Sequence, residues 1–227
     1  MIKTLISDFD GTISAVDFYL TIQKLHMTAP DCMRFWDDYI AHKITHFEAM
    51  QGIMGTIDKT EDAMDPALDM MKLDPDFAES FEKISMAGWS LAIVSAGAEW
   101  YIRQHLNRAG IPMTTTLDEM RPGVAYVAAN TGGFISGKPG LHLTLPESSP
   151  FFCVETGINK KQATQYFIGV SDSSAFAGDG RPDLQSALLL PPTRRFATGW
   201  LADELTSRNE PFVKFTRWNQ VASELLR

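Results

Sequence analysis

The segment Asp8-Phe9-Asp10-Gly11-Thr12 directly follows the short apolar run Leu5-Ile6-Ser7, close to the beginning of the chain. An apolar run bounded by turn residues predicts a buried strand, although Asp itself is uncommon in strands. Side chains two positions apart on a strand point the same way, so Asp8 and Asp10 can face one site. Two crowded carboxylates cost folding energy unless a cation or a proton relieves them. We therefore expect a functional strand end here, and the alternative is a turn that carries two solvated acids.

Strand and helix patterns alternate along most of the 227-residue chain. An apolar run at residues 90–95 predicts a second buried strand, and helical patterns at 77–87 and 99–109 flank it, each ending before a glycine. Later we expect strands at 124–130, 175–177, near 196 and at 212–215, glycine-rich turns at 132–133 and 137–140, and helices at 159–167, from 182 onward, at 201–208 and at 219–226. This order predicts an α/β protein with a Rossmann-like, doubly wound parallel sheet.

Residues 16–71 have a different pattern, because their apolar residues recur at spacings of three and four, which indicates helices. Thr45-His46-Phe47-Glu48 has the spacing of a capping box at a helix start. About sixty helical residues are too many for a crossover connection and indicate a small subdomain. We predict a core domain formed by residues 1–14 and 75–227, and a helical cap subdomain formed by residues 15–74.

Polar residues recur at predicted strand ends and at one helix start. They are Asp8 and Asp10, Ser95 with Gly97, Lys160, and Asp179 with Asp183. Open parallel sheets bind ligands beyond the carboxyl ends of their strands, so these residues can converge in one place. Carboxylate oxygens suit Mg²⁺, and a lysine with a metal ion can neutralise a phosphoryl group during transfer. The set therefore predicts phosphoryl-transfer chemistry.

These motifs resemble those of haloacid dehalogenase superfamily phosphatases. The family's DxDG[TV] motif is matched at residues 8–12, its strand-end hydroxyl by Ser95, its lysine by Lys160, and its GDGxxD motif at 178–183. Within that superfamily the chain resembles phosphoserine phosphatases and, more closely, the methionine-salvage group acting on 2-hydroxy-3-keto-5-methylthiopentenyl 1-phosphate. Two positions depart from that group's pattern: Thr156 stands in place of a Cys, and Ala96 in place of a common Gly.

The resemblance implies a role for each matched residue. Asp8 would be the nucleophile and form an aspartyl-phosphate. Asp10 would be the general acid and base. Thr12, Ser95, Ala96 and Lys160 would bind the phosphate, and Asp8, Asp179, Asp183 and the backbone carbonyl of Asp10 would hold Mg²⁺. The expected activity is therefore hydrolysis of a small phosphorylated metabolite. The helical cap implies that the site can close over its substrate.

Several alternatives stay open at the level of the sequence. Lys161 adjoins Lys160 and could serve in its place. The enzyme could be a phosphoserine-type phosphatase or a phosphotransferase, or the chain could be a non-catalytic binding module. In the cap we expect most of Phe35, Trp36, Tyr39, Met50 and Met54 to form its own core, while a minority of them could line the pocket. Asp17 or Phe18 could reach the pocket from the first cap helix, and we expect His42 and His46 to be solvated or packing residues.

The amino-acid composition limits the classes of molecule that the protein can bind. The net charge is −8, and no long run of Lys or Arg interrupts the acids, which argues against a nucleic acid or an anionic membrane surface as partner. No stretch approaches 18 apolar residues, and the first residues lack the apolar length of a signal peptide, so we expect a cytoplasmic protein. Two cysteines far apart in sequence predict free thiols, and a single disulfide between them is the alternative. The oligomeric state is left open between monomer and homodimer.

Overall fold

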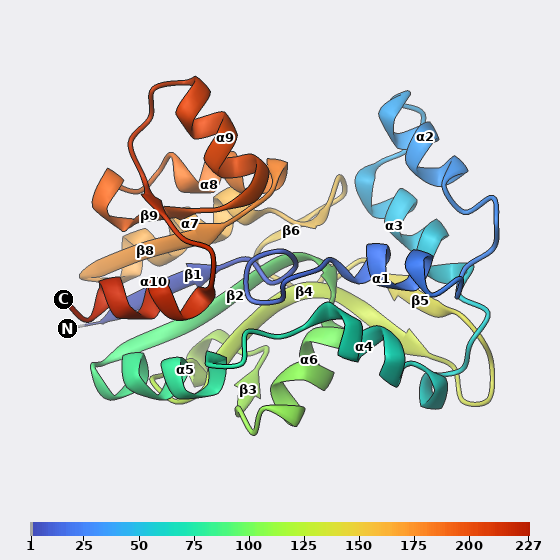
Figure 1. The fold of residues 1–227 in the computed structure, drawn as a ribbon, viewed down its shortest axis with the longest axis horizontal. Helices are drawn as coiled ribbons and strands as arrows, with labels where there is room; N and C mark the ends of the chain where they lie inside the picture. Colours follow the sequence, from blue (N-terminus) through green and yellow to red (C-terminus); the bar gives the residue numbers. More distant parts are fainter. Residues whose placement is uncertain (1) are drawn as a thin grey trace.

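The computed structural model describes residues 2–227 and confirms the predicted α/β fold (Figure 1). Its main sheet has eight strands in the described residues, in the order β10-β9-β8-β1-β2-β4-β3, with β5 paired to β4. Every pairing in this sheet is parallel except that of β4 with β5. The strands are β1 (Lys3–Ser7), β2 (Trp89–Ala98), β3 (Met113–Thr114), β4 (Ala125–Phe134), β5 (Leu141–Thr144), β8 (Ser173–Gly178), β9 (Arg195–Ala197) and β10 (Val213–Lys214).

Helices cover both faces of the sheet, as expected for a doubly wound fold (Figure 1). One face packs against α5 (Phe77–Met86), α6 (Glu99–Arg108) and α10 (Trp218–Leu225). The other packs against α7 (Lys160–Val170), α8 (Leu184–Ala187) and α9 (Gly199–Ser207). No helix of residues 2–227 has both the length and the apolar character that crossing a bilayer requires.

Four helices follow β1 in the chain, within the residues predicted as the cap (15–74), and we call them the cap helices (Figure 1). These are α1 (Phe18–Lys24), α2 (Arg34–Ile40), α3 (His46–Gly55) and α4 (Asp65–Met71). The capping box predicted for α3 is confirmed: the Glu48 amide donates to Thr45 Oγ1 (3.2 Å), and the Thr45 amide donates to the Glu48 carboxylate (2.7 Å).

The two chain segments that connect the cap to the core run side by side. The amide of Ala15 donates to the carbonyl of Met71 (3.0 Å), and the amide of Asp74 donates to the carbonyl of Ile13 (3.1 Å). Ser14 and Leu73 form an isolated antiparallel bridge between them. The chain therefore leaves the core and returns to it at one place.

One strand is longer than the sequence pattern predicts. We expected it to end at Asn130, before the glycine pair at 132–133, but β4 continues to Phe134 and pairs antiparallel with β5. Gly132 and Gly133 both pair with residues of β5, so the glycines lie inside the hairpin arm instead of at its turn. Gly132 has φ 124°. The Gln51 side chain of α3 donates to the carbonyl of Leu143 (2.7 Å), so this arm supports the cap.

The C-terminal helix α10 and the residue before it, Arg217, fasten two distant parts of the core. The indole of Trp218 donates to Ser7 Oγ (3.1 Å) and packs against Phe77, with ring centroids 4.8 Å apart. Arg217 forms ion pairs with Asp74 (3.2 Å) and Asp76 (2.5 Å), just after the cap rejoins the core. The chain end thus holds the end of β1 and the return connection in fixed positions.

Candidate active site

The predicted site residues meet at the carboxyl edge of three neighbouring strands. Asp8 follows β1 and Asp179 follows β8, while Ser95 lies near the end of β2. Because β2, β1 and β8 are adjacent and parallel, their ends place these side chains together. A cavity of about 420 Å³ lies here, between the strand ends and the cap.

Lys160, the first residue of α7, connects two acids of the site. Its Nζ lies 2.7 Å from Asp8 Oδ2 and 2.7 Å from Asp183 Oδ1, and all three side chains are buried. Burial lowers the pKa of Lys160, but the carboxylates of Asp183 and Asp8 outweigh that effect and raise it, so the ammonium stays charged. Lys161 is exposed, so of these two lysines it is Lys160 that reaches Asp8.

Three carboxylates form a compact acidic cluster around this lysine. Asp8, Asp179 and Asp183 each offer an oxygen, and these oxygens lie within 4.8 Å of one another. Burial, followed by repulsion from Asp183, raises the pKa of Asp8 well above its ordinary value and that of Asp179 to about 7. One lysine therefore does not compensate the negative charge that these residues carry when ionised.

This acidic cluster fits a hard divalent cation such as Mg²⁺. Its ligands would be carboxylate oxygens, and the raised pKa values show that the ionised acids are held at a cost that a cation would remove. Asp183 is already committed, because Oδ1 pairs with Lys160 while Oδ2 accepts from the amides of Asp179 (3.1 Å) and Gly180 (2.9 Å). Asp8 and Asp179 line the cavity and Asp183 does not, so Asp8 and Asp179 would be the direct carboxylate ligands, with Asp183 holding them in place or acting through water.

Asp10 lies outside the acidic cluster and faces the cap side of the cavity. Its carboxylate accepts from the amide of Phe18 (2.9 Å) and from the hydroxyl of Tyr101 (2.5 Å). Burial, and next the charge of Asp17, raise the pKa of Asp10 to about 6, although the Tyr101 hydrogen bond opposes the shift. A carboxyl group with this pKa can both give up and accept a proton near neutral pH, as a general acid and base must.

Tyr101 is a site residue that the sequence analysis missed. It is 1% exposed on α6, and burial, together with the charge of Asp10, raises its pKa well above the ordinary value, so it stays protonated and donates. The only hint in the sequence is Gly97, where an added Cβ would collide with the Tyr101 hydroxyl. A glycine after Ser95 therefore leaves the space through which Tyr101 reaches Asp10.

Ser95, Ala96 and Gly97 form an irregular end of β2, because the register against β4 shifts between Val94 and Ala98. Such a bulge re-aims side chains at a strand end. All three residues line the cavity, Ser95 Oγ accepts from the Gly97 amide (3.0 Å), and the Asn130 amide group donates to the Ala96 carbonyl (2.7 Å).

Thr12 is placed differently from the other residues expected to bind phosphate. It is buried, it is not among the cavity-lining residues, and its hydroxyl donates to Asp179 Oδ1 (3.1 Å). Gly11, with φ 68°, lets the chain pass close to the same carboxylate, because a Cβ at this position would collide with Asp179. In this structure Thr12 thus orients Asp179.

The cap supplies the opposite wall of the cavity, and this wall is largely aromatic and apolar. Its main side chains are Tyr19, Trp36, Tyr39, His46, Met50 and Met54. The Tyr19 and Trp36 rings stack with centroids 6.0 Å apart. Several residues expected in the cap's core therefore also face the site. Asp17 lines the cavity, whereas Phe18 is buried and stacks on Tyr101 instead.

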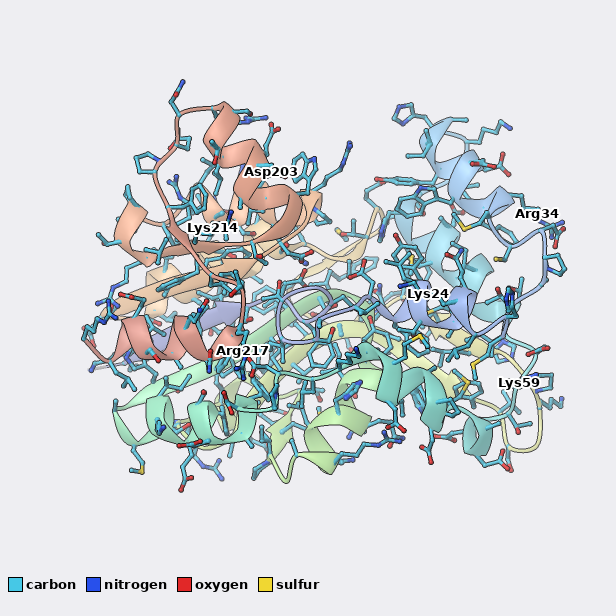
Figure 2. The ribbon with its side chains drawn as sticks, in the orientation of Figure 1. Lys24, Arg34, Lys59, Asp203, Lys214 and Arg217 are labelled. Carbon is cyan, nitrogen blue, oxygen red and sulfur yellow. The ribbon has the colours of Figure 1, made fainter. Side chains whose placement is uncertain are left out.

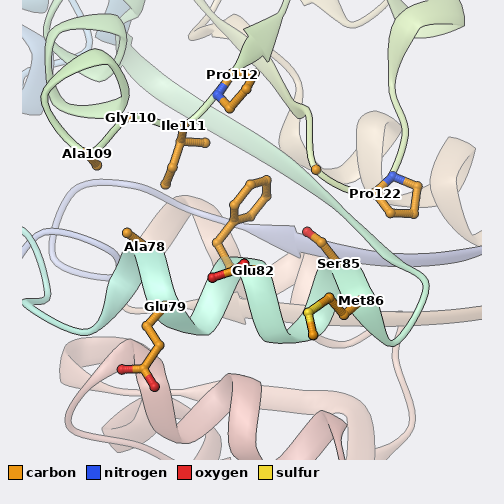
Figure 3. A pocket seen from close by; sticks show the side chains of 12 residues that line it. Ala78, Glu79, Glu82, Ser85, Met86, Ala109, Gly110, Ile111, Pro112 and Pro122 are labelled. Carbon is orange, nitrogen blue, oxygen red and sulfur yellow. The ribbon is translucent and has the colours of Figure 1, made fainter.

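A larger hollow of about 710 Å³ lies elsewhere, between α5 and the segments that precede β3 and β4 (Figure 3). Its wall includes Phe81, Ile111, Pro112 and the carboxylates of Glu79 and Glu82. These residues lie near the amino ends of the parallel strands, away from the edge where Asp8 and Asp179 follow theirs. Its lining contains no lysine or arginine, whereas Lys160 and Arg181 line the smaller cavity, so we take the smaller cavity as the candidate active site.

Solved structures share the fold of this chain. A phosphoserine phosphatase captured as a phospho-aspartyl intermediate analogue aligns with TM-score 0.63 at 12% identity, over 98% of both chains. A HAD family hydrolase from Salmonella enterica serovar Typhi gives TM-score 0.65 at 16% identity, over 94% of this chain and 66% of that one. A probable phosphoserine phosphatase from Vibrio cholerae gives 0.66 at 15% identity, over 100% and 64%.

No protein-family model matches the sequence, and neither does any curated protein. The chain has the mostly parallel α/β fold of haloacid dehalogenase-type hydrolases. More narrowly, it has the fold of the phosphoserine phosphatases among them, over almost its full length.

Proposed function

We propose that the protein is a Mg²⁺-dependent phosphomonoesterase that works through an aspartyl-phosphate on Asp8. The observation that carries this proposal is the contact of Lys160 with Asp8 (2.7 Å), beside the Asp179 carboxylate and opposite Asp10 in one cavity. A nucleophile, a counter-cation, a metal-binding acid and a proton donor are the groups that such a reaction needs.

The reaction divides into two steps. The Asp8 carboxylate attacks phosphorus and the bond to the leaving oxygen breaks, while Asp10 gives that oxygen its proton. Asp10 then takes a proton from water as the water oxygen attacks the same phosphorus, which releases inorganic phosphate and restores Asp8. Lys160 lies against Asp8, where its charge favours the phosphoryl oxygens. A bound Mg²⁺, held by Asp8 and Asp179, would supply positive charge to the same oxygens.

We infer a small phosphorylated metabolite as substrate, of the kind a methylthio-ketopentyl phosphate represents. Support comes from the cap wall, where the thioethers of Met50 and Met54 and the rings of Trp36 and Tyr39 would surround an apolar leaving group. Phosphoserine is the competing substrate, because phosphoserine phosphatases share the fold.

A phosphatase assay with Mg²⁺ over a panel of metabolite phosphates tests the proposal. We expect phosphate release that EDTA abolishes, and a loss of at least about 1,000-fold in the Asp8→Asn variant, because the nucleophile is gone. Asn keeps an oxygen that can accept from the Phe9 amide, which donates to Asp8 Oδ1 (2.7 Å), so the variant should fold. Full activity of Asp8→Asn, or no release from any phosphate, would contradict the proposal.

A further inference from the structure

His46 occupies a fixed position in the cap wall of the cavity. It is the first residue of α3, and its ring meets Trp36 and Tyr39 edge-on, with centroids 6.1 Å and 5.4 Å away. The backbone beside it is tied to the core, because the amide of Phe47 donates to the carbonyl of Glu155 (2.9 Å). The imidazole is therefore held in place by both the cap and the core.

The two nitrogens of this ring have different surroundings. Nδ1 is buried, and within residues 2–227 it has no hydrogen-bond partner. Nδ1 is unpaired in either tautomer, but a buried donor without an acceptor is rarer in proteins than a buried acceptor without a donor, so we assign the proton of the neutral ring to Nε2. Burial, and next the charge of Lys160, lower the pKa of His46 to about 4, so the ring is neutral near pH 7. His46 thus offers a single N–H that no described residue engages.

The charges of the cap show which leaving groups suit this donor. Residues 15–74 contain five Lys and Arg, and none of them lines the cavity. Lys24 and Arg34 are exposed, and Figure 2 shows Arg34 and Lys59 at the outer edge of the cap. The only charged group that the cap adds to the cavity is the carboxylate of Asp17. This wall would repel a substrate carboxylate and accept a neutral group.

We propose that His46 is a specificity residue that donates from Nε2 to a neutral oxygen of the leaving group. The substrate class is then the phosphate monoester of an apolar alcohol that also carries a carbonyl or hydroxyl oxygen. This inference rests on the phosphomonoesterase activity proposed above. Trp36 and Tyr39 contact the apolar part. A bound substrate covers the Nε2 donor, and an analogue without the oxygen would then leave that donor unpaired.

Two matched esters and two matched variants test the role. We compare kcat/KM for 2-oxohexyl phosphate and hexyl phosphate, because the ratio cancels effects common to both substrates. His46→Phe keeps a ring without a donor, and we expect it to lower the ratio about tenfold, mainly through KM for the oxo ester. His46→Gln places an amide N–H near the position of Nε2 and should restore the ratio to within about threefold of wild type. Tyr39→Phe, which keeps the neighbouring ring and removes its hydroxyl, should leave the ratio within the same range.

Each other outcome has a definite meaning. An unchanged ratio in His46→Phe, or a tenfold fall in Tyr39→Phe instead, would overturn the role of His46. If the wild type hydrolyses p-nitrophenyl phosphate with Mg²⁺ but neither hexyl ester, the substrate class is wrong and the phosphomonoesterase stands. If p-nitrophenyl phosphate is not hydrolysed either, the proposed function fails together with this inference. A melting temperature for each variant separates loss of folding from loss of recognition.

Discussion

Lys160 holds together charges that could not otherwise be buried side by side. Asp183 is fully buried and Asp8 is 6% exposed, yet both are anchored to a single ammonium 2.7 Å away. Removing one partner of such a cluster leaves the other charges uncompensated, which costs far more than losing a surface ion pair. We therefore expect this lysine to contribute to the stability of the fold as well as to the proposed chemistry.

Replacing Lys160 by Met should lower the free energy of unfolding by about 3–5 kcal/mol, because the carboxylates of Asp8 and Asp183 then face each other unpaired. Lys161→Met is the matched control and should change it by less than about 0.5 kcal/mol, since that side chain is exposed. Urea unfolding at pH 8 measures both. Equal effects of the two substitutions would show that the buried ion pairs contribute nothing.

The raised pKa of Asp179 predicts how stability depends on pH. Between its ordinary value of 3.8 and about 7, the folded protein keeps a proton that the unfolded chain has released. The free energy of unfolding of the metal-free protein should therefore fall as pH rises through this range. Added Mg²⁺ should stabilise the protein more at pH 8 than at pH 5, because protons compete for the same carboxylates.

Melting temperatures from pH 5 to pH 8, with and without Mg²⁺, check this expectation. Asp179→Asn should flatten the metal-free curve and weaken the effect of Mg²⁺, because it removes both the titrating group and a ligand. A metal-free melting temperature that rises over this range, equally in both proteins, would contradict the prediction.

The sequence predicts those site residues whose positions follow from the order of the strands. Asp8, Ser95 and Asp179 stand at the ends of apolar runs, so their convergence follows from a parallel sheet. The contact of Tyr101 with Asp10 was not predictable, because a tyrosine in an amphipathic helix is usually a packing residue. It depends on the space left by Gly97, which no periodicity reveals. The roles of these residues, Thr12 and Ala96 included, stay predictions.

The helix α3 forms part of the candidate site, because His46 and two methionines of its inner face line the cavity. Its start depends on the capping box of Thr45 and Glu48. We expect Thr45→Ala to lower the free energy of unfolding by about 1 kcal/mol, and Thr45→Ser to have a smaller effect because it keeps the hydroxyl.

Thermal unfolding measures this change, and the KM for the best substrate should rise in Thr45→Ala because the helix start carries His46. If Thr45→Ala and Thr45→Ser behave alike, the side-chain cap has no part in placing that residue.

The sequence predicts the strands and helices of the core more accurately than it predicts the arm formed by β4 and β5. Apolar runs and glycine stops locate most core elements, but the arm is a strand that continues through two glycines. Glycines normally indicate a turn, and here tertiary contact with α3 through Gln51 outweighs that preference. The division into a core of residues 1–14 and 75–227 and a cap of residues 15–74 stays a prediction.

At the scale of the whole molecule, α10 secures the sheet on which the candidate site is built. Trp218 is fully buried between Phe77 and the end of β1. We expect Trp218→Ala to lower the free energy of unfolding by about 3–5 kcal/mol, because it leaves a large cavity. Trp218→Phe should cost clearly less, since it keeps most of the ring.

Denaturant unfolding of both variants checks this, and kcat at a temperature well below melting should stay close to wild type, because Trp218 does not line the cavity. An Ala variant as stable as the wild type would show that the C-terminal helix is not an essential part of the core.

The paired connections at Ala15 and Asp74 also bear on how such a protein can change over evolutionary time. Ser14 and Leu73 pair with each other, so any inserted sequence has to start and end at the same two neighbouring points of the core. The predicted core and the predicted cap can therefore diverge at different rates. A new substrate would need a new insertion, but no new sheet.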